Sequence, residues 1–218
     1  MATPLLIGEL ATSLVQRTPQ TKVSATFIFG RAQGDWEATE GDSGILETAA
    51  QFYRDGKSGE IYIPDTMAGL TFSGAVVPTM YPGPEAWITN LQNLGVPPDN
   101  VGTITPTAIH TRGESDGFVA LCKQRNWFTV AVIMQKHQVL RTALAMLKSF
   151  KEQHHHLHIR FLCPEKMNWN KHVYGSQGEH LLPRSEHARI EIEKVLAQQE
   201  AGFLATFAQL EEYLAMGA

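Results

Sequence analysis

The stretch WFTVAVIMQKHQVLRTALAMLKSF, residues 127–150, decides the fold. Its first part, Trp127–Met134, is a continuous apolar run of strand length, which is typical of a strand buried on both faces. From Val139 to Phe150 the apolar residues recur at helical spacing and form one stripe. A buried strand that leads almost directly into an amphipathic helix is the building unit of a parallel α/β sheet.

Strand and helix patterns alternate along the rest of the chain as well. We expect further strands at residues 22–30, 60–65, 101–104 and 157–163, and further helices at residues 43–55, 84–95, 111–125, 185–198 and 203–215. The predicted fold class is therefore α/β: a three-layer, Rossmann-like parallel sheet with helices on both faces and a C-terminal helical extension. Residues 1–182, with a helix at 5–17, are expected to form the Rossmann-like domain, and residues 183–218 the extension packed on it.

The composition indicates a globular protein. The chain has 218 residues, of which 43% are hydrophobic and 18% charged, and its net charge is −4. This length suits one domain, and the acidic balance argues against binding to nucleic acid or anionic membranes, which needs a basic surface. No apolar run approaches the length of a bilayer span and no secretory leader is evident, so we expect a cytoplasmic protein in which Cys122 and Cys163 are reduced.

In sheets of this kind, ligands bind outside the carboxyl ends of the strands. The predicted ends are Gly30, Asp65, residues 105–110, Gln135 and Cys163. Three of the loops that follow are long, at residues 31–42, 66–83 and 164–182. Because short connections are normal in these folds, we expect the long loops to form walls of a binding site.

Lysine, histidine and arginine gather where the central strand ends. Gln135, Lys136 and His137 follow the strand, and Arg141 lies in the first helical turn, on the side away from the apolar stripe. The N–H groups of a first turn attract anions, whereas a cation there is unfavourable, so a negatively charged ligand between His137 and Arg141 explains the cluster. Alternatively, Arg141 pairs with a neighbouring carboxylate and His137 only caps the strand.

A second group of polar residues opens the preceding helix, in HTRGES at residues 110–115. Thr111 and Glu114 have the spacing of a capping box, in which Thr111 closes the start of the helix and Glu114 reaches back. In the functional interpretation, Thr111, Glu114 and Ser115 project toward the Lys-His-Arg cluster, and Glu114 is its carboxylate partner. One glutamate can serve in both ways.

Gly30, Arg31 and Asp65 complete the predicted ligand site. A glycine directly after a strand lets the backbone approach a ligand closely. The glycines of GRAQGDW, residues 30–36, are four apart and do not form a dinucleotide-binding fingerprint. The histidines of HHHLH, residues 154–158, precede a strand and point in different directions, so we expect no specific metal site there.

In their order along the chain, these features resemble the YdcF/SanA/ElyC-type domain, a bacterial family of largely unknown function with a Rossmann-like fold. The resemblance covers Phe27 to about Cys163. It rests on FIFG at 27–30, the Gly56-Lys57 turn, Glu85 at the opening of a helix that ends in LGVP at 94–97, the Thr111/Glu114 pair, and His137 followed by Arg141. The tail YGSQG…SEHARIEIEK is also similar to the end of soluble members. The resemblance implies binding of a small anionic or nucleotide-like molecule, with S-adenosylmethionine suggested for one branch.

Two positions depart from the pattern of that family. Pro64, Asp65 and Thr66 stand where members usually have Ser-Gly-Gly, and Arg141 follows His137 by four residues rather than by three. The first departure argues against phosphate binding by this loop. The second argues for a ligand that differs from that of the family.

The sequence therefore predicts a protein that binds a small anionic or nucleotide-like molecule at the carboxyl ends of its strands. We expect an enzyme that acts on a phosphorylated or nucleotide-type substrate by hydrolysis or group transfer, either as a monomer or as a homo-oligomer. Arg31, Lys136 and Arg141 would supply positive charge, His137 would be the general acid or base because its ordinary pKa lies near working pH, and Glu114 would orient it. The alternatives are a non-catalytic sensor of S-adenosylmethionine or a nucleotide, and an interaction module that docks through its C-terminal helices.

Overall fold

Five parallel strands form the central sheet of the protein. The computed structural model describes residues 11–15, 22–29, 42–69, 81–175 and 180–216. The strands are β1 (Val23–Ile28), β2 (Ser58–Pro64), β3 (Val101–Ile104), β4 (Thr129–Ile133) and β5 (His158–Leu162). They lie in the order β3-β2-β1-β4-β5, and every neighbouring pair is parallel. The predicted Rossmann-like α/β fold class is confirmed.

The strand order reverses between β1 and β4, at the centre of the sheet. These two strands pair from Ala25 opposite Val130 to Ile28 opposite Ile133, so their carboxyl ends lie side by side. From β1 the chain proceeds to one edge of the sheet, and from β4 to the other. In open α/β sheets such a switch point leaves a crevice between the departing loops, and ligands bind there.

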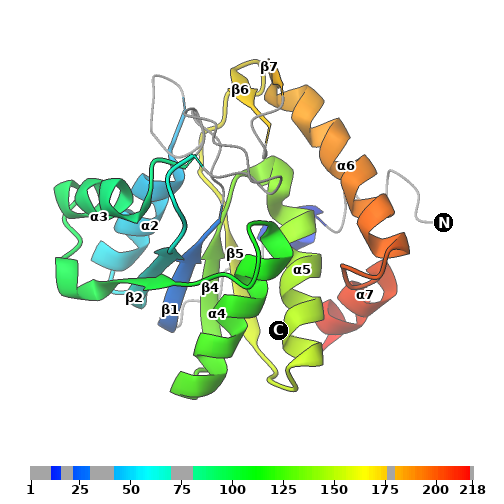
Figure 1. Ribbon diagram of the computed structural model, residues 1–218, viewed down its shortest axis with the longest axis horizontal. Coiled ribbons are helices and arrows are strands. Elements are labelled where there is room, and N and C mark those ends of the chain that lie inside the picture. Colours follow the sequence, from blue (N-terminus) through cyan, green and yellow to red (C-terminus); the bar gives the residue numbers. More distant parts are fainter. Residues whose placement is uncertain (1–10, 16–21, 30–41, 70–80, 176–179, 217–218) are drawn as a thin grey trace.

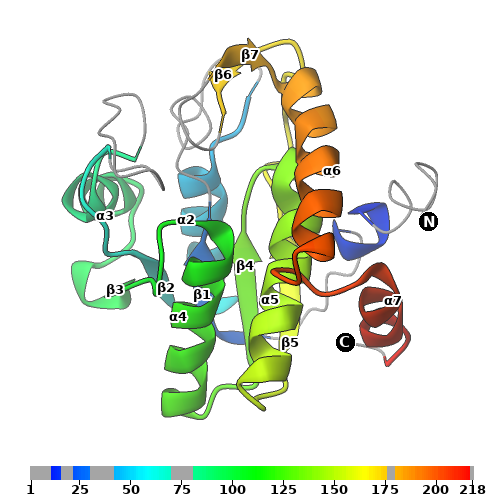
Figure 2. The same cartoon turned by 45° about the vertical axis from the view of Figure 1, so that its right-hand side comes forward.

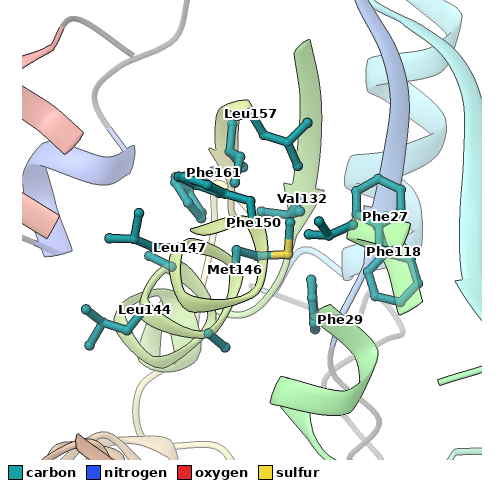
Figure 3. Packing of buried hydrophobic residues seen from close by; sticks show 14 of the residues in the cluster. Phe27, Phe29, Phe118, Val132, Leu144, Met146, Leu147, Phe150, Leu157 and Phe161 are labelled. Carbon is teal, nitrogen blue, oxygen red and sulfur yellow. The ribbon is translucent and has the colours of Figure 1, made fainter. Parts of the chain in front are cut away.

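Helices cover both faces of the sheet (Figure 1). The helices α2 (Ile45–Arg54) and α3 (Pro84–Asn93) pack on one face, and α4 (Thr111–Arg125) and α5 (Val139–Glu152) on the other. Side chains of successive strand residues point to opposite faces. In β1, Ile28 accordingly joins the core beneath α2 and α3, whereas Phe27 packs in the core beneath α4 and α5. There the Phe27 ring stacks on Phe118, with centroids 5.0 Å apart (Figure 3).

The C-terminal extension contains α6 (Arg184–Glu200) and α7 (Phe207–Ala215). Figure 2 shows α6 running alongside α5 on its outer side, with α7 at the far end. The α7 helix protects the edge of the sheet, because the Tyr213 hydroxyl accepts a hydrogen bond from Ile159 N (2.8 Å) and donates one to Leu157 O (3.1 Å). Edge strands with satisfied backbone groups are less prone to pair with other chains.

The boundaries of the predicted elements agree with the structure to within a few residues, with two exceptions. The segment expected as the loop 164–182 contains an antiparallel pair, β6 (His172–Tyr174) and β7 (Leu181–Pro183). Strands of three residues are too short to produce a periodic pattern, so the sequence does not predict them. Of the helix predicted at 5–17, residues 11–15 are helical with Leu14 buried, and the remainder lies outside the described residues.

A close backbone approach makes Gly113 essential to the start of α4. A Cβ atom at this position would lie 2.3 Å from Ala108 O and 2.5 Å from Ala108 N. We therefore expect Gly113→Ala to lower the free energy of unfolding by roughly 1–3 kcal/mol, as overpacking does elsewhere. Urea denaturation measures this. Lys123→Ala on the exposed part of the same helix is the control, and equal effects of the two substitutions would contradict the prediction.

Candidate functional site

The candidate site lies at the switch point, where β4 continues into α5. The connection is a single turn of 3-10 helix, η2 (Lys136–Gln138), closed by a hydrogen bond from Gln138 N to Gln135 O of 2.9 Å. Gln135 is fully buried. The α6 helix packs directly on η2, so the C-terminal extension covers the strand end on this side.

Arg141, in the first turn of α5, is buried and engaged by two other elements. Its Nε and Nη2 donate to the two carboxylate oxygens of Glu191 on α6, at 2.5 and 3.2 Å. Its Nη1 donates to the Thr111 hydroxyl on α4 at 2.5 Å. The expectation that Arg141 is free to reach a ligand is therefore wrong, because α6 lies over the face of α5 that the apolar stripe leaves uncovered.

The alternative, in which Arg141 pairs with a carboxylate, is the observed arrangement. The carboxylate is Glu191 and not Glu114. Burial raises the pKa of the Glu191 carboxyl, but the charge and the hydrogen bonds of Arg141, together with Lys194 and His137, lower it below its ordinary value. Glu191 is therefore ionised at neutral pH, and the contact is an ion pair.

His137 lies among charged groups that come from α5 and α6. Burial lowers the pKa of its imidazole to about 3; the negative charge of Glu191 opposes this shift, and the positive charges of Arg184, His187 and Arg141 add to it. The expectation that this pKa lies near working pH is thus wrong. His137 is neutral at pH 7, because burial penalises the charged imidazolium and the nearby guanidinium groups add to that penalty.

The ring of His187, on α6, lies beside that of His137, with centroids 6.4 Å apart. Its Nε2 lies 2.8 Å from the carbonyl oxygen of Val173 in β6. A carbonyl only accepts hydrogen bonds, so Nε2 of His187 carries a proton. His187 thereby ties the start of α6 to the β6–β7 hairpin.

A buried charge network joins the start of α6 to two loops at the strand ends. Arg184 donates from Nη1 to both carboxylate oxygens of Asp42, at 2.8 and 2.7 Å, and Lys171 Nζ lies 3.1 Å from the same carboxylate. The backbone N–H of Asn168 also donates to Asp42, at 3.3 Å. Asp42 and Arg184 are fully enclosed, whereas Lys171 is partly exposed. This network fixes the loop after β5 and the base of α6 against the segment before α2.

The polar residues at the start of α4 are arranged differently from the prediction. The helix begins at Thr111 as expected, but its N-cap is His110, whose Nδ1 accepts a hydrogen bond from Gly113 N at 3.0 Å. The capping box predicted for Thr111 and Glu114 is therefore wrong. Thr111 contacts Arg141 instead, which does bring it to the Lys-His-Arg cluster as predicted. Ser115 is buried and donates to Thr111 O within the helix, and Glu114 is buried as well.

The other predicted site residues lie around the same end of the sheet or outside the described residues. Lys136 Nζ donates to Glu165 O in the loop after β5, at 2.8 Å. Asp65 ends β2 and is exposed, with its N–H bonded to Ile104 O. Gly30 and Arg31 lie outside the described residues.

The residues missed from the sequence are Asp42, Lys171, Arg184, His187 and Glu191. From the sequence alone, the simplest interpretation of Glu186, Glu191 and Glu193 is a solvated helix face. Glu186 and Glu193 are exposed, but Glu191 is buried, so the interpretation is wrong for Glu191. A signal does exist: Arg184, His187 and Glu191 are spaced by three and four residues, which places them on one face of a helix. The same face includes the buried Val195, while Ile192 and Leu196 are exposed.

A cavity of about 370 Å³ lies elsewhere, between α2 and the end of β5. Its walls combine the apolar side chains of Phe52 and Leu162 with the carboxylates of Glu47, Asp55 and Glu165. Among the described residues, none of those predicted for the ligand site lines it. Arg54 also lines the cavity, but three carboxylates against one guanidinium make the lining negative on balance, which does not suit the anionic ligand that the sequence predicts.

The described residues contain no cysteine with a lowered pKa, no metal-binding cluster and no helix suited to span a membrane. Burial raises the pKa of the Cys122 thiol and that of the Cys163 thiol to about 12, so neither forms a thiolate at neutral pH. In the histidine cluster, His155 Nε2 lies 2.7 Å from Trp127 O, and within the described residues no three side chains of His, Cys, Asp or Glu are arranged to hold a metal ion. None of the helices in those residues combines the length and the apolar character that crossing a membrane requires.

No protein-family model, no curated protein and no solved structure matches this chain. The resemblance to YdcF-type domains stays a prediction based on the motifs in the sequence.

Proposed function

We propose that the protein binds a small anionic molecule of the phosphorylated or nucleotide type at the carboxyl ends of β1 and β4. One observation supports this most directly. At the topological switch point, a neutral histidine, His137, lies among the guanidinium groups of Arg141 and Arg184. Neutral imidazole and guanidinium are the groups that proteins use to bind phosphate and to move its protons.

The low pKa of His137 suits a role as a base that acts only when the ligand is bound. The imidazole is neutral and weakly basic, because burial lowers its pKa and the nearby guanidinium groups lower it further. A bound phosphate brings negative charge and raises the pKa of the imidazole toward neutrality. His137 can then accept a proton from a water molecule or from a substrate hydroxyl, which is what hydrolysis or group transfer at a phosphorylated substrate requires.

A non-catalytic sensor that uses the same strand-end residues is the second candidate, and it would bind the ligand through the same charges without turnover. The third candidate, docking through the C-terminal helices, would have to use α6, where Ile192 and Leu196 are exposed, because α7 is already covered. Leu210, Tyr213 and Leu214 carry the apolar face of this fully described helix, and all three are buried against the body of the protein.

The test compares two lysines that make the same kind of contact. Lys136 Nζ donates to Glu165 O at 2.8 Å beside the site, and Lys123 Nζ donates to Gln153 O at 2.9 Å at the opposite end of α4. We expect inorganic phosphate, AMP or S-adenosylmethionine to raise the melting temperature of the wild-type protein. For an anionic ligand, Lys136→Met should weaken binding about 10-fold to 100-fold, the value of one charge-assisted hydrogen bond.

The Lys123→Met control should bind as the wild type does. Isothermal titration calorimetry gives the affinities, and the products of an incubation with a phosphorylated substrate distinguish an enzyme from a sensor. Absence of binding to every anion tested, or equal affinities of the two lysine variants, would refute the proposed function.

A further inference from the structure

The guanidinium of Arg141 is paired with a carboxylate of the protein itself. Its Nε/Nη2 edge, which has the geometry that matches a carboxylate or a phosphate in bidentate fashion, faces both oxygens of Glu191 at 2.5 and 3.2 Å. Its Nη1 is bonded to the neutral hydroxyl of Thr111. A ligand that uses this edge of Arg141 therefore has to displace a carboxylate.

The contacts that α6 makes with the rest of the protein allow a ligand to displace Glu191 from Arg141. The α6 helix, all of which the structure describes, buries Arg184, His187, Glu191 and Val195, so three of its four buried side chains are polar. Buried ion pairs contribute little net stability, since the loss of hydration offsets their attraction. Glu191 also has a second cation within reach, because Lys194 Nζ lies 3.9 Å from Oε1 and is partly exposed.

We propose that Glu191 is a specificity-determining residue of the strand-end site: its carboxylate competes with the ligand for Arg141, so that only ligands with more than one negative charge bind there. This inference rests on the proposed function. A tethered carboxylate competes at a high effective concentration, and a monoanion has no electrostatic advantage over it. A phosphate dianion has twice the charge and three acceptor oxygens, so it can replace Glu191 at the guanidinium.

The test is Glu191→Gln, which keeps the shape of the side chain and an oxygen acceptor toward Arg141 but removes the charge. At pH 8 we expect this variant to bind inorganic phosphate and sulfate about 10-fold more tightly than the wild type does. It should also bind acetate, which the wild type should not. The matched control is Glu193→Gln on the same helix, where the carboxylate is exposed and pairs with Arg189 on the surface.

The outcomes separate this inference from the proposed function. If the wild type binds phosphate and Glu191→Gln binds it equally or more weakly, Glu191 only holds Arg141 in place, and the inference fails while the function stands. If neither protein binds phosphate or sulfate, both fail. Should the variant be too unstable to measure, the wild type still decides, because equal affinities for sulfate and acetate would overturn the inference.

Discussion

Replacing Asp42 with asparagine is expected to lower the free energy of unfolding by about 3–5 kcal/mol, the usual effect of leaving one partner of a buried ion pair uncompensated. Arg184 is fully enclosed and directs Nη1 at both oxygens of Asp42, so it cannot turn to water when the negative charge is removed. Lys171, the second cation on this carboxylate, is partly exposed and can move to solvent. The loss of stability therefore comes mainly from Arg184, whose buried charge is left without a carboxylate partner.

The control is the same change from aspartate to asparagine at the exposed Asp55. Asp55 forms an exposed ion pair with Lys57 at 3.3 Å, and its pKa is lowered by hydrogen bonds from Gln51 and Lys57. Asp55→Asn should change stability far less than Asp42→Asn does, because exposed pairs contribute little. Urea denaturation at pH 7 measures both variants, and similar losses would show that the burial of Asp42 is unimportant.

A double substitution distinguishes a lost attraction from an isolated buried charge. If the cost of Asp42→Asn comes from an uncompensated Arg184, then Asp42→Leu combined with Arg184→Met should be more stable than Asp42→Asn, since apolar side chains of similar volume often replace a buried pair without loss. A double variant that is less stable than the single one would mean that the pair itself stabilises the fold.

The fold could be predicted because its elements are encoded by local patterns. The apolar run around β4 and the stripe of α5 each produce a signal over several consecutive residues, and the parallel arrangement follows from their alternation. The β6–β7 hairpin could not be found in this way, because each strand has three residues and little buried apolar surface.

The candidate site was predicted only in part, because its pairs join residues that are far apart in the sequence. The position of Gln135, Lys136 and His137 at a strand end follows from local pattern, and the structure confirms it. The partner of Arg141 is Glu191, fifty residues further along the chain, and local pattern does not reveal which of the carboxylates reaches a given arginine.

The unfolding free energy is expected to fall as the pH is lowered, because His137 stays neutral in the folded protein. The pKa of its imidazole is about 3 in the folded state, lowered mainly by burial, against an ordinary value of 6.5. Between these values the unfolded chain binds a proton that the folded protein does not, so stability decreases as the pH falls below 6.5. The slope is about 1.4 kcal/mol per pH unit, which gives about 2 kcal/mol between pH 7.5 and pH 5 and roughly 4–5 kcal/mol over the whole range.

Substituting His137 separates its contribution to the pH dependence of unfolding from the contributions of the other titrating groups. His137→Gln keeps a polar side chain without a proton to gain, so its unfolding free energy should vary less between pH 7.5 and pH 5, by about 2 kcal/mol. His172→Gln, at an exposed position on β6, should retain the wild-type slope. Saturating sulfate should also flatten the slope of the wild type, since an anion beside His137 raises the pKa of the imidazole. A slope that is the same in all three proteins and in sulfate would mean that His137 neither titrates in this way nor faces the anion site.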